Sequence, residues 1–137
     1  TADLQSPVFA RTALIAAEVM LNRTPEGLKL GALTGILTEG AYERLREEVA
    51  EQLPDLKSKN MMWEPYVEKV EAQREQRGLR IYSVSGELVQ VGAVNDQAFI
   101  DPLRFRLLLG IEPNTNLGQR RQFPFQVASY RLTLDSE

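Results

Sequence analysis

The 137-residue sequence contains no cysteine and no histidine. Without cysteine the chain can form no disulfide, which is typical of a cytoplasmic protein. Zinc sites normally use cysteine or histidine ligands, and the usual catalytic triads need histidine or cysteine, so the sequence argues against both. Carboxylate, lysine or tyrosine chemistry and a carboxylate-bound hard cation remain open. We expect no metal, no cofactor and no enzymatic activity.

Long apolar runs are also missing. The largest apolar clusters lie around Ala13–Ala17 and Leu107–Leu109, far short of the about 18 residues that a membrane span needs. The N-terminal segment carries Asp3 and no basic stretch ahead of an apolar one, so we expect no signal peptide. Both observations predict a cytoplasmic protein without membrane contact.

Basic excess is absent too, since the formal net charge is −3 and the isoelectric point is near 5.1. Dedicated nucleic-acid binders more often carry a surplus of lysine and arginine. Apolar residues make up 43% and charged residues 26% of the chain, which is ordinary for a globular protein. The length predicts a single domain, residues 1–137.

Helical signals dominate the first half of the chain. Ser6 and Pro7 are a good helix start, and the helix is expected to reach Asn22. The apolar stretch Leu28–Leu37 has helical spacing. Thr38 is expected to cap a longer amphipathic helix that Pro54 ends.

The second half mixes helix and strand signals. Glu64-Pro65 and Gly78 look like the start and stop of another helix. Leu79–Val84 and Glu87–Val94 are predicted as a hairpin that turns at Ser85-Gly86. Asp101-Pro102 would open a short helix through Leu109. Gln122–Leu134 reads as a strand whose apolar alternation changes phase, which predicts a bulge near Ala128-Ser129.

These elements predict an α+β fold. A winged-helix-like helical unit followed by a β-hairpin would occupy residues 6–94. A C-terminal extension, residues 95–137, would add a helix and a strand that pack on a small antiparallel sheet.

Two segments resemble a known family. ALIAAEVMLNRTPEGLKLGALTGIL, residues 13–37, is similar to the opening of the kleisin-associated, ScpB-type winged-helix subunits of bacterial chromosome-condensation complexes. QREQRGLRIYSVSGELVQVG, residues 73–92, is similar to their wing. An extra segment, Lys57–Glu68, and the whole of Asn95–Glu137 depart from the pattern. The resemblance implies a role in protein–protein assembly on a chromosome-associated or other DNA-associated complex.

Two groups of residues are candidates for partner binding. The predicted Thr38–Leu53 helix has an acidic outer face that would repel DNA, so we interpret it as facing water or a protein. An apolar cluster could form an adaptable binding patch, although core packing is the alternative. The candidate residues are Glu43, Glu47, Glu51, Met61, Met62 and Trp63.

The best basic cluster lies near the C-terminus, with aromatic residues beside it that could stack on bases. It consists of Arg104, Arg106, Arg120 and Arg121. The alternation of Arg with Leu and Phe around Leu103–Leu107 is equally typical of an amphipathic surface.

Three hypotheses follow. The first is a non-catalytic interaction module that binds another protein or forms a homodimer. The alternative is a nucleic-acid-binding or transcription-regulatory domain that uses the C-terminal arginines. The third is an enzyme or small-ligand protein that uses carboxylates with Tyr66 or Tyr82 in a deep pocket.

Overall fold

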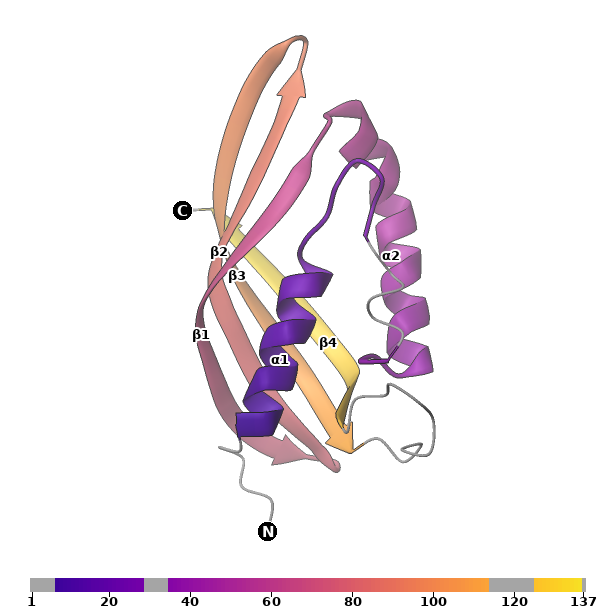
Figure 1. Ribbon diagram of the computed structural model, residues 1–137, viewed down its shortest axis with the longest axis vertical. Coiled ribbons are helices and arrows are strands. Elements are labelled where there is room, and N and C mark those ends of the chain that lie inside the picture. The colour runs from indigo at the N-terminus through magenta and orange to yellow at the C-terminus, as the bar shows by residue number, and fades with distance from the viewer. Residues whose placement is uncertain (1–6, 29–34, 114–124, 137) are drawn as a thin grey trace.

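The computed structural model describes residues 7–28, 35–113 and 125–136, which form two helices and four strands (Figure 1). In chain order these are α1 (Pro7–Met20), α2 (Glu39–Ser58), β1 (Met62–Gln76), β2 (Leu79–Val94), β3 (Gln97–Pro113) and β4 (Phe125–Ser136). Among the described helices, none combines the length with the apolar character that crossing a membrane requires.

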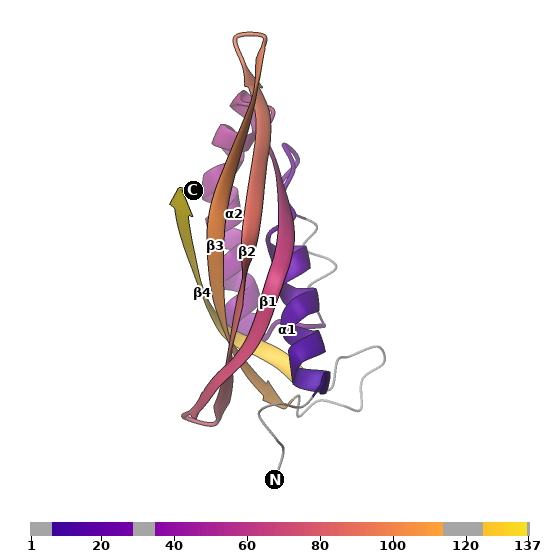
Figure 2. The same cartoon turned by 90° about the vertical axis from the view of Figure 1, so that its left-hand side faces the viewer.

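The four strands form one antiparallel sheet in the order β1-β2-β3-β4, so each strand pairs with its neighbour in sequence. Both helices lie on the same side of this sheet (Figures 1 and 2). The β2–β3 hairpin extends beyond the helices at the top of Figure 1. The sheet therefore has a helix-covered face, an outer face without helices, and a projecting hairpin.

The core lies between the helices and the covered face. Successive side chains of a strand point to opposite faces. Here the set that faces the helices is mostly buried, while the other set is mostly half-buried in β2 and half-buried or exposed in β3. The buried strand residues on the covered face are Trp63, Tyr82, Val84, Leu88, Phe105, Leu107, Leu109, Ile111, Val127 and Tyr130. The helices add Phe9, Ala13, Ala16, Ala17 and Met20 from α1 and Ala41, Leu45, Val49 and Leu56 from α2. The small residues of α1 allow close packing on the sheet.

The connection between α1 and α2 touches both edges of the sheet. Arg23 forms an isolated antiparallel bridge with Trp63 of β1, and Leu37 forms a parallel bridge with Val127 of β4. The buried Arg23 side chain also stacks over the Trp63 ring, 4.6 Å from its centroid, and donates to the Gln52 side chain at 2.6 Å. This connection satisfies backbone groups at one point on each edge strand.

Several predicted elements are confirmed. The first helix begins at Pro7, and Thr38 caps α2 by accepting a hydrogen bond from the Ala41 N–H. Ile111 pairs with Val127 while Gly110 pairs with Ser129, so Ala128 is the extra residue of the predicted bulge. That bulge keeps Val127 and Tyr130 both on the covered face.

The predicted winged-helix fold is wrong, because three segments form long strands. The stretch read as a helix between Pro65 and Gly78 belongs to β1, and the predicted helix from Asp101 belongs to β3. The predicted turn at Ser85-Gly86 lies inside β2. Each segment carries proline or glycine, which imitates helix ends and turns. Pairing with distant strands decides their conformation instead.

The close approach of β1 explains why a glycine occupies position 86 in the middle of β2. Gly86 lies opposite a bulge in β1, where the register shifts between Val67 and Lys69. A Cβ atom at this position would overlap the Tyr66 carbonyl oxygen. Glycine inside a strand often marks such a close approach of two backbones.

Two other helix predictions have a mixed outcome. Pro54 does not end α2, which continues to Ser58. The predicted short helix Leu28–Leu37 falls mostly on residues 29–34, outside the described residues, and its described end contains a turn and a bridge.

Candidate interaction site

The projecting hairpin carries an apolar patch on the outer face. Met62, Val91 and Ile100 lie side by side on three adjacent strands, and Val89 with Pro102 forms the next row. Ile100 is 73% exposed and Met62 40%, while the other three are half-buried. We call these five residues the hairpin patch. Grouped apolar side chains in water are typical of protein-binding surfaces, whereas single exposed ones are common.

The outer face becomes polar below the hairpin patch. Arg104 of β3 makes a bidentate ion pair with Glu68 of β1, with nitrogen–oxygen distances of 2.6 and 3.0 Å. The Arg104 guanidinium lowers the pKa of the Glu68 carboxyl through this hydrogen bond. Arg106 donates to the Ser83 hydroxyl at 3.2 Å. The hairpin patch therefore has a charged border, as protein interfaces commonly do.

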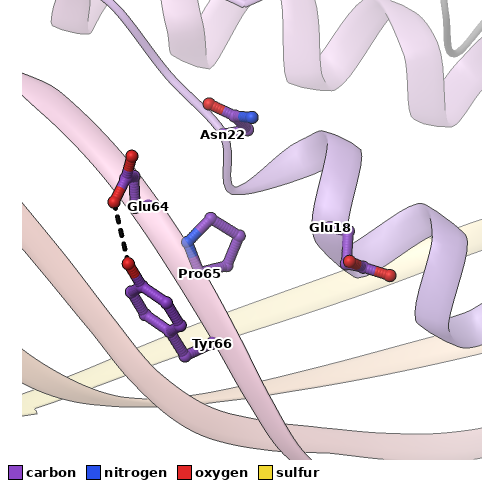
Figure 3. Close-up of a pocket in the computed structure, with 5 residues that line it drawn as sticks. All are labelled: Glu18, Asn22, Glu64, Pro65 and Tyr66. Atoms are coloured by element: carbon purple, nitrogen blue, oxygen red, sulfur yellow. Dashed lines mark hydrogen bonds between the residues drawn. The ribbon is translucent and has the colours of Figure 1, made fainter.

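A polar pocket lies between the C-terminal end of α1 and the edge of β1 (Figure 3). Its volume is about 290 Å³, and it is lined by Glu18, Asn22, Glu64, Pro65 and Tyr66. The Tyr66 hydroxyl donates to the Glu64 carboxylate at 2.9 Å, and this bond raises the pKa of Tyr66. Glu64 lies opposite Val89, so the pocket and the hairpin patch share a boundary. The carboxylates and the amide could accept hydrogen bonds from a basic or polar group.

The enzyme hypothesis required a deep pocket with converging carboxylates and Tyr66 or Tyr82. Tyr66 does line the polar pocket, but Tyr82 is 1% exposed and lies in the core. Among residues 7–28, 35–113 and 125–136, no three His, Cys, Asp or Glu side chains gather into a group that could hold a metal ion. The expectation of no enzyme, metal or cofactor stays a prediction.

The predicted apolar cluster divides between core and surface. Met61 and Trp63 are 6% and 5% exposed and belong to the core, whereas Met62 between them faces outward. The alternation of β1 produces this division. Only Met62 of the cluster can take part in the hairpin patch.

The predicted acidic residues lie away from the hairpin patch, on the exposed side of α2. Glu43 pairs with Arg46 at 2.7 Å, and Glu47 and Glu51 are exposed. The structure does not bring these three glutamates together with the methionines in one surface. Their predicted role in partner binding stays untested.

The structure describes two of the four predicted arginines. Arg104 and Arg106 are exposed and lie on the same face of β3, because they are two residues apart in one strand. Arg120 and Arg121 lie outside the described residues. The Glu68 carboxylate already neutralises much of the Arg104 charge.

Most of the hairpin patch is not predicted by the sequence. Ile100 lies between the predicted strand that ends at Val94 and the predicted helix that begins at Asp101, so it belonged to no predicted element. The signal was present in the alternation of Val89 and Val91 next to Met62. It becomes informative only once β1, β2 and β3 are aligned.

No protein-family model matches the sequence, and no curated protein sequence matches it. Solved structures do share its fold. The periplasmic domain of DotI is 12% identical, with a TM-score of 0.66, and the alignment covers 97% of this chain and 99% of that one. An IcmL-like type IV secretion system protein from Legionella pneumophila is 10% identical, with a TM-score of 0.66 and coverage of 94% and 92%.

A third solved structure is similar, the TraE protein in complex with 4-(1H-pyrrol-1-yl)pyridine-2-carboxylic acid. It is 14% identical, with a TM-score of 0.61 and coverage of 96% and 98%. These likenesses overturn the resemblance to ScpB-type winged-helix subunits. Two predicted functions are therefore wrong as well, namely a role in a chromosome- or DNA-associated complex and nucleic-acid binding.

Proposed function

We propose that this domain is a non-catalytic assembly component of a type IV secretion system. The observation that carries the proposal is the likeness over nearly the full length of the chain to DotI and to an IcmL-like secretion protein. Coverage above 90% of both partners in each comparison means that the whole domain is shared, not one common motif.

In this proposal the hairpin patch contacts another protein of the complex. Burying an exposed branched side chain yields about 1.5–3 kcal/mol, and Ile100 is the most exposed of the large apolar residues described. The charged border around Glu68 and Arg104 would set the orientation of the partner. The partner is a protein with an apolar contact surface and a basic or hydrogen-bond-donating group for the polar pocket.

We also propose a periplasmic location in place of the predicted cytoplasmic one. The solved DotI domain is periplasmic. The lack of cysteine is compatible with an oxidising compartment, because the fold has no thiol to mispair. A fusion of the complete gene product to alkaline phosphatase should be active in cells. If the alkaline phosphatase fusion is inactive and only a matching fusion to a cytoplasmic reporter is active, this location is wrong.

Site-specific photocrosslinking tests the contact surface in native cells. A photoreactive phenylalanine at Ile100 should give a discrete crosslink to another envelope protein. Val94 offers a matched control, because it is a 44% exposed apolar residue of the same hairpin on the opposite face. Equal crosslinking from both positions, or none from Ile100, would count against the hairpin patch.

Substitution of the same two positions gives a second test. Ile100→Asp should abolish co-purification with the crosslinked partner, because a desolvated carboxylate would replace an apolar anchor. Val94→Asp should leave co-purification intact. If both variants retain as much of the partner as the wild-type protein does, the hairpin patch is excluded as the contact surface.

A further inference from the structure

The two edge strands of the sheet are protected unequally. On β1, Trp63 exchanges both backbone hydrogen bonds with Arg23, and the next residue with the same orientation is Pro65, which has no N–H. Bulges in the register near Glu68 and Gln73 interrupt the rest of that edge. Prolines and bulges are the means by which edge strands avoid pairing with other chains.

Within residues 7–28, 35–113 and 125–136, contacts protect only the first half of the β4 edge. Val127 exchanges hydrogen bonds with Ile36 and Thr38, and the Tyr130 carbonyl accepts from Arg44 at 3.2 Å. Because backbone direction alternates along a strand, Leu132 and Leu134 also direct their N–H and C=O groups away from β3. Towards its C-terminal end β4 diverges from α2, and no described element lies beyond this edge (Figures 1 and 2).

The free stretch has a self-complementary sequence. Arg131, Thr133 and Asp135 are exposed on the outer face, and Leu132 and Leu134 are half-buried on the covered face. If two copies pair antiparallel about Thr133, each Arg131 lies opposite Asp135 of the second copy. Each Leu132 then lies opposite Leu134 of the second copy. Opposite charges and apolar pairs directly across two strands are stabilising.

The hydrogen-bond geometry allows this register. In this register Leu132 of one copy and Leu134 of the other form a hydrogen-bonded pair. They exchange two backbone hydrogen bonds through the N–H and C=O groups that point away from β3. Thr133 meets its own copy as a non-hydrogen-bonded pair on the two-fold axis. A shift by one residue would place each leucine opposite a polar residue of the other face.

Charge on the outer face also continues across the junction. Within one chain, Glu87 pairs with Arg104, and Arg104 pairs with Asp135, so the sign alternates along this row. Arg131 of the second copy would be the next member of the row, again with the opposite sign. Two-fold symmetry repeats the arrangement on the other side of the axis.

From this edge we propose that the chain forms a symmetric homodimer in which β4 pairs antiparallel with β4 of a second copy about Thr133. The sheet then runs continuously through both copies. The hairpin patch takes no part in this contact, so the dimer and the proposed secretion role can fail separately.

Disulfide trapping tests the register directly, because the native chain has no cysteine. Thr133→Cys should give a disulfide-linked dimer under mild oxidation, since non-hydrogen-bonded pairs bring Cα atoms to about 4.5 Å, within the range of disulfides. Ser129→Cys is the matched control, as an exposed residue of the same strand and face that lies off the axis. Equal linkage of both variants, or none of Thr133→Cys, would overturn the register.

Charge reversal tests the contact without cysteine. Arg131→Asp and Asp135→Arg should each weaken dimerisation about tenfold or more in sedimentation, because like charges then face each other twice. An equimolar mixture of the two variants should recover dimers, since every facing pair is again opposite in sign. A monomeric wild-type chain at millimolar concentration, or no recovery in the mixture of folded variants, would overturn the proposal.

Discussion

The two faces of the sheet use the same strands for different purposes. The covered face carries aromatic and aliphatic side chains that are almost fully buried, while the outer face carries ion pairs and the hairpin patch. Adjacent residues of a strand can therefore differ completely in role. Leu107 is 1% exposed on the covered face, and Leu108 is half-buried on the outer face. Face, and not residue type, decides whether an apolar residue here supports the fold or can meet a partner.

Leu107 and Leu108 allow the strongest test of this comparison. Leu107→Ala should lower the free energy of unfolding by about 2–5 kcal/mol, because it removes buried atoms and leaves a cavity. Leu108→Ala should cost only about 1 kcal/mol, since the side chain is half in water already. Urea denaturation measures both. Equal losses would mean that the outer face also supports the core.

The bulge at Gly86 gives the next largest effect. Gly86→Ala should destabilise the domain by about 1–3 kcal/mol, because the new Cβ must push the β1 backbone away at Tyr66. Gly40→Ala is the control, since a Cβ there meets nothing within 4 Å, and it should stabilise α2 by roughly 0.5 kcal/mol. Thermal unfolding followed by circular dichroism distinguishes the two. A harmless Gly86→Ala would contradict the close approach of β1 and β2.

Tyr130 links the covered face to α2 and gives the domain a pH response. Its hydroxyl donates to the Glu48 carboxylate at 2.6 Å, and burial together with this bond raises the pKa of Tyr130 above its ordinary 10.0. Tyr130→Phe should lower the free energy of unfolding by about 1–2 kcal/mol at neutral pH.

The sign of the pH response follows from the raised pKa. Above pH 10 the unfolded chain releases the Tyr130 proton while the folded chain retains it. Stability is therefore complete below pH 10 and decreases as the pH rises beyond it. Tyr130→Phe should show a smaller decrease between pH 10 and pH 11. If the free energy of unfolding decreases equally with pH in the wild type and in Tyr130→Phe, this role of Tyr130 is excluded.

The Glu68–Arg104 pair should have the smallest effect. Both side chains are about half-exposed, so water screens their attraction. Glu68→Gln should leave the melting temperature unchanged within error at 0.15 M salt. A clear decrease would mean that the outer face contributes to stability through its charges, contrary to the comparison above.

The features that the sequence predicts correctly are those that depend on local chemistry. The Thr38 cap and the start of α1 follow from side-chain hydrogen bonding and from proline geometry at neighbouring residues. The bulge at Ala128 follows from a change of phase in apolar alternation. Each of these signals lies within a few residues of the structure that it determines.

The missed features depend on residues far apart in the sequence. β1 contains Glu64-Pro65 and a charged second half, which together imitate a capped, solvated helix. Its strand conformation is imposed by β2, with which it pairs from Met62 to Gln76. The predicted hairpin with its turn at Ser85-Gly86 completed the order of a winged-helix unit, but both of its arms belong to the single strand β2. The false family resemblance followed from that order. The hairpin patch was hidden for the same reason, since it exists only across three strands.

The connection that touches both edges of the sheet also bears on how the chain folds. Its bridges join Arg23 to Trp63, and Leu37 to Val127 near the other end of the sequence. Closing such distant contacts is entropically costly, so they form late. The three hairpin-type pairings of the sheet can form first, each between neighbours in sequence. We therefore expect the helical segment to lock onto a sheet that already exists, and the amide of Thr38 to gain hydrogen-exchange protection after those of β2.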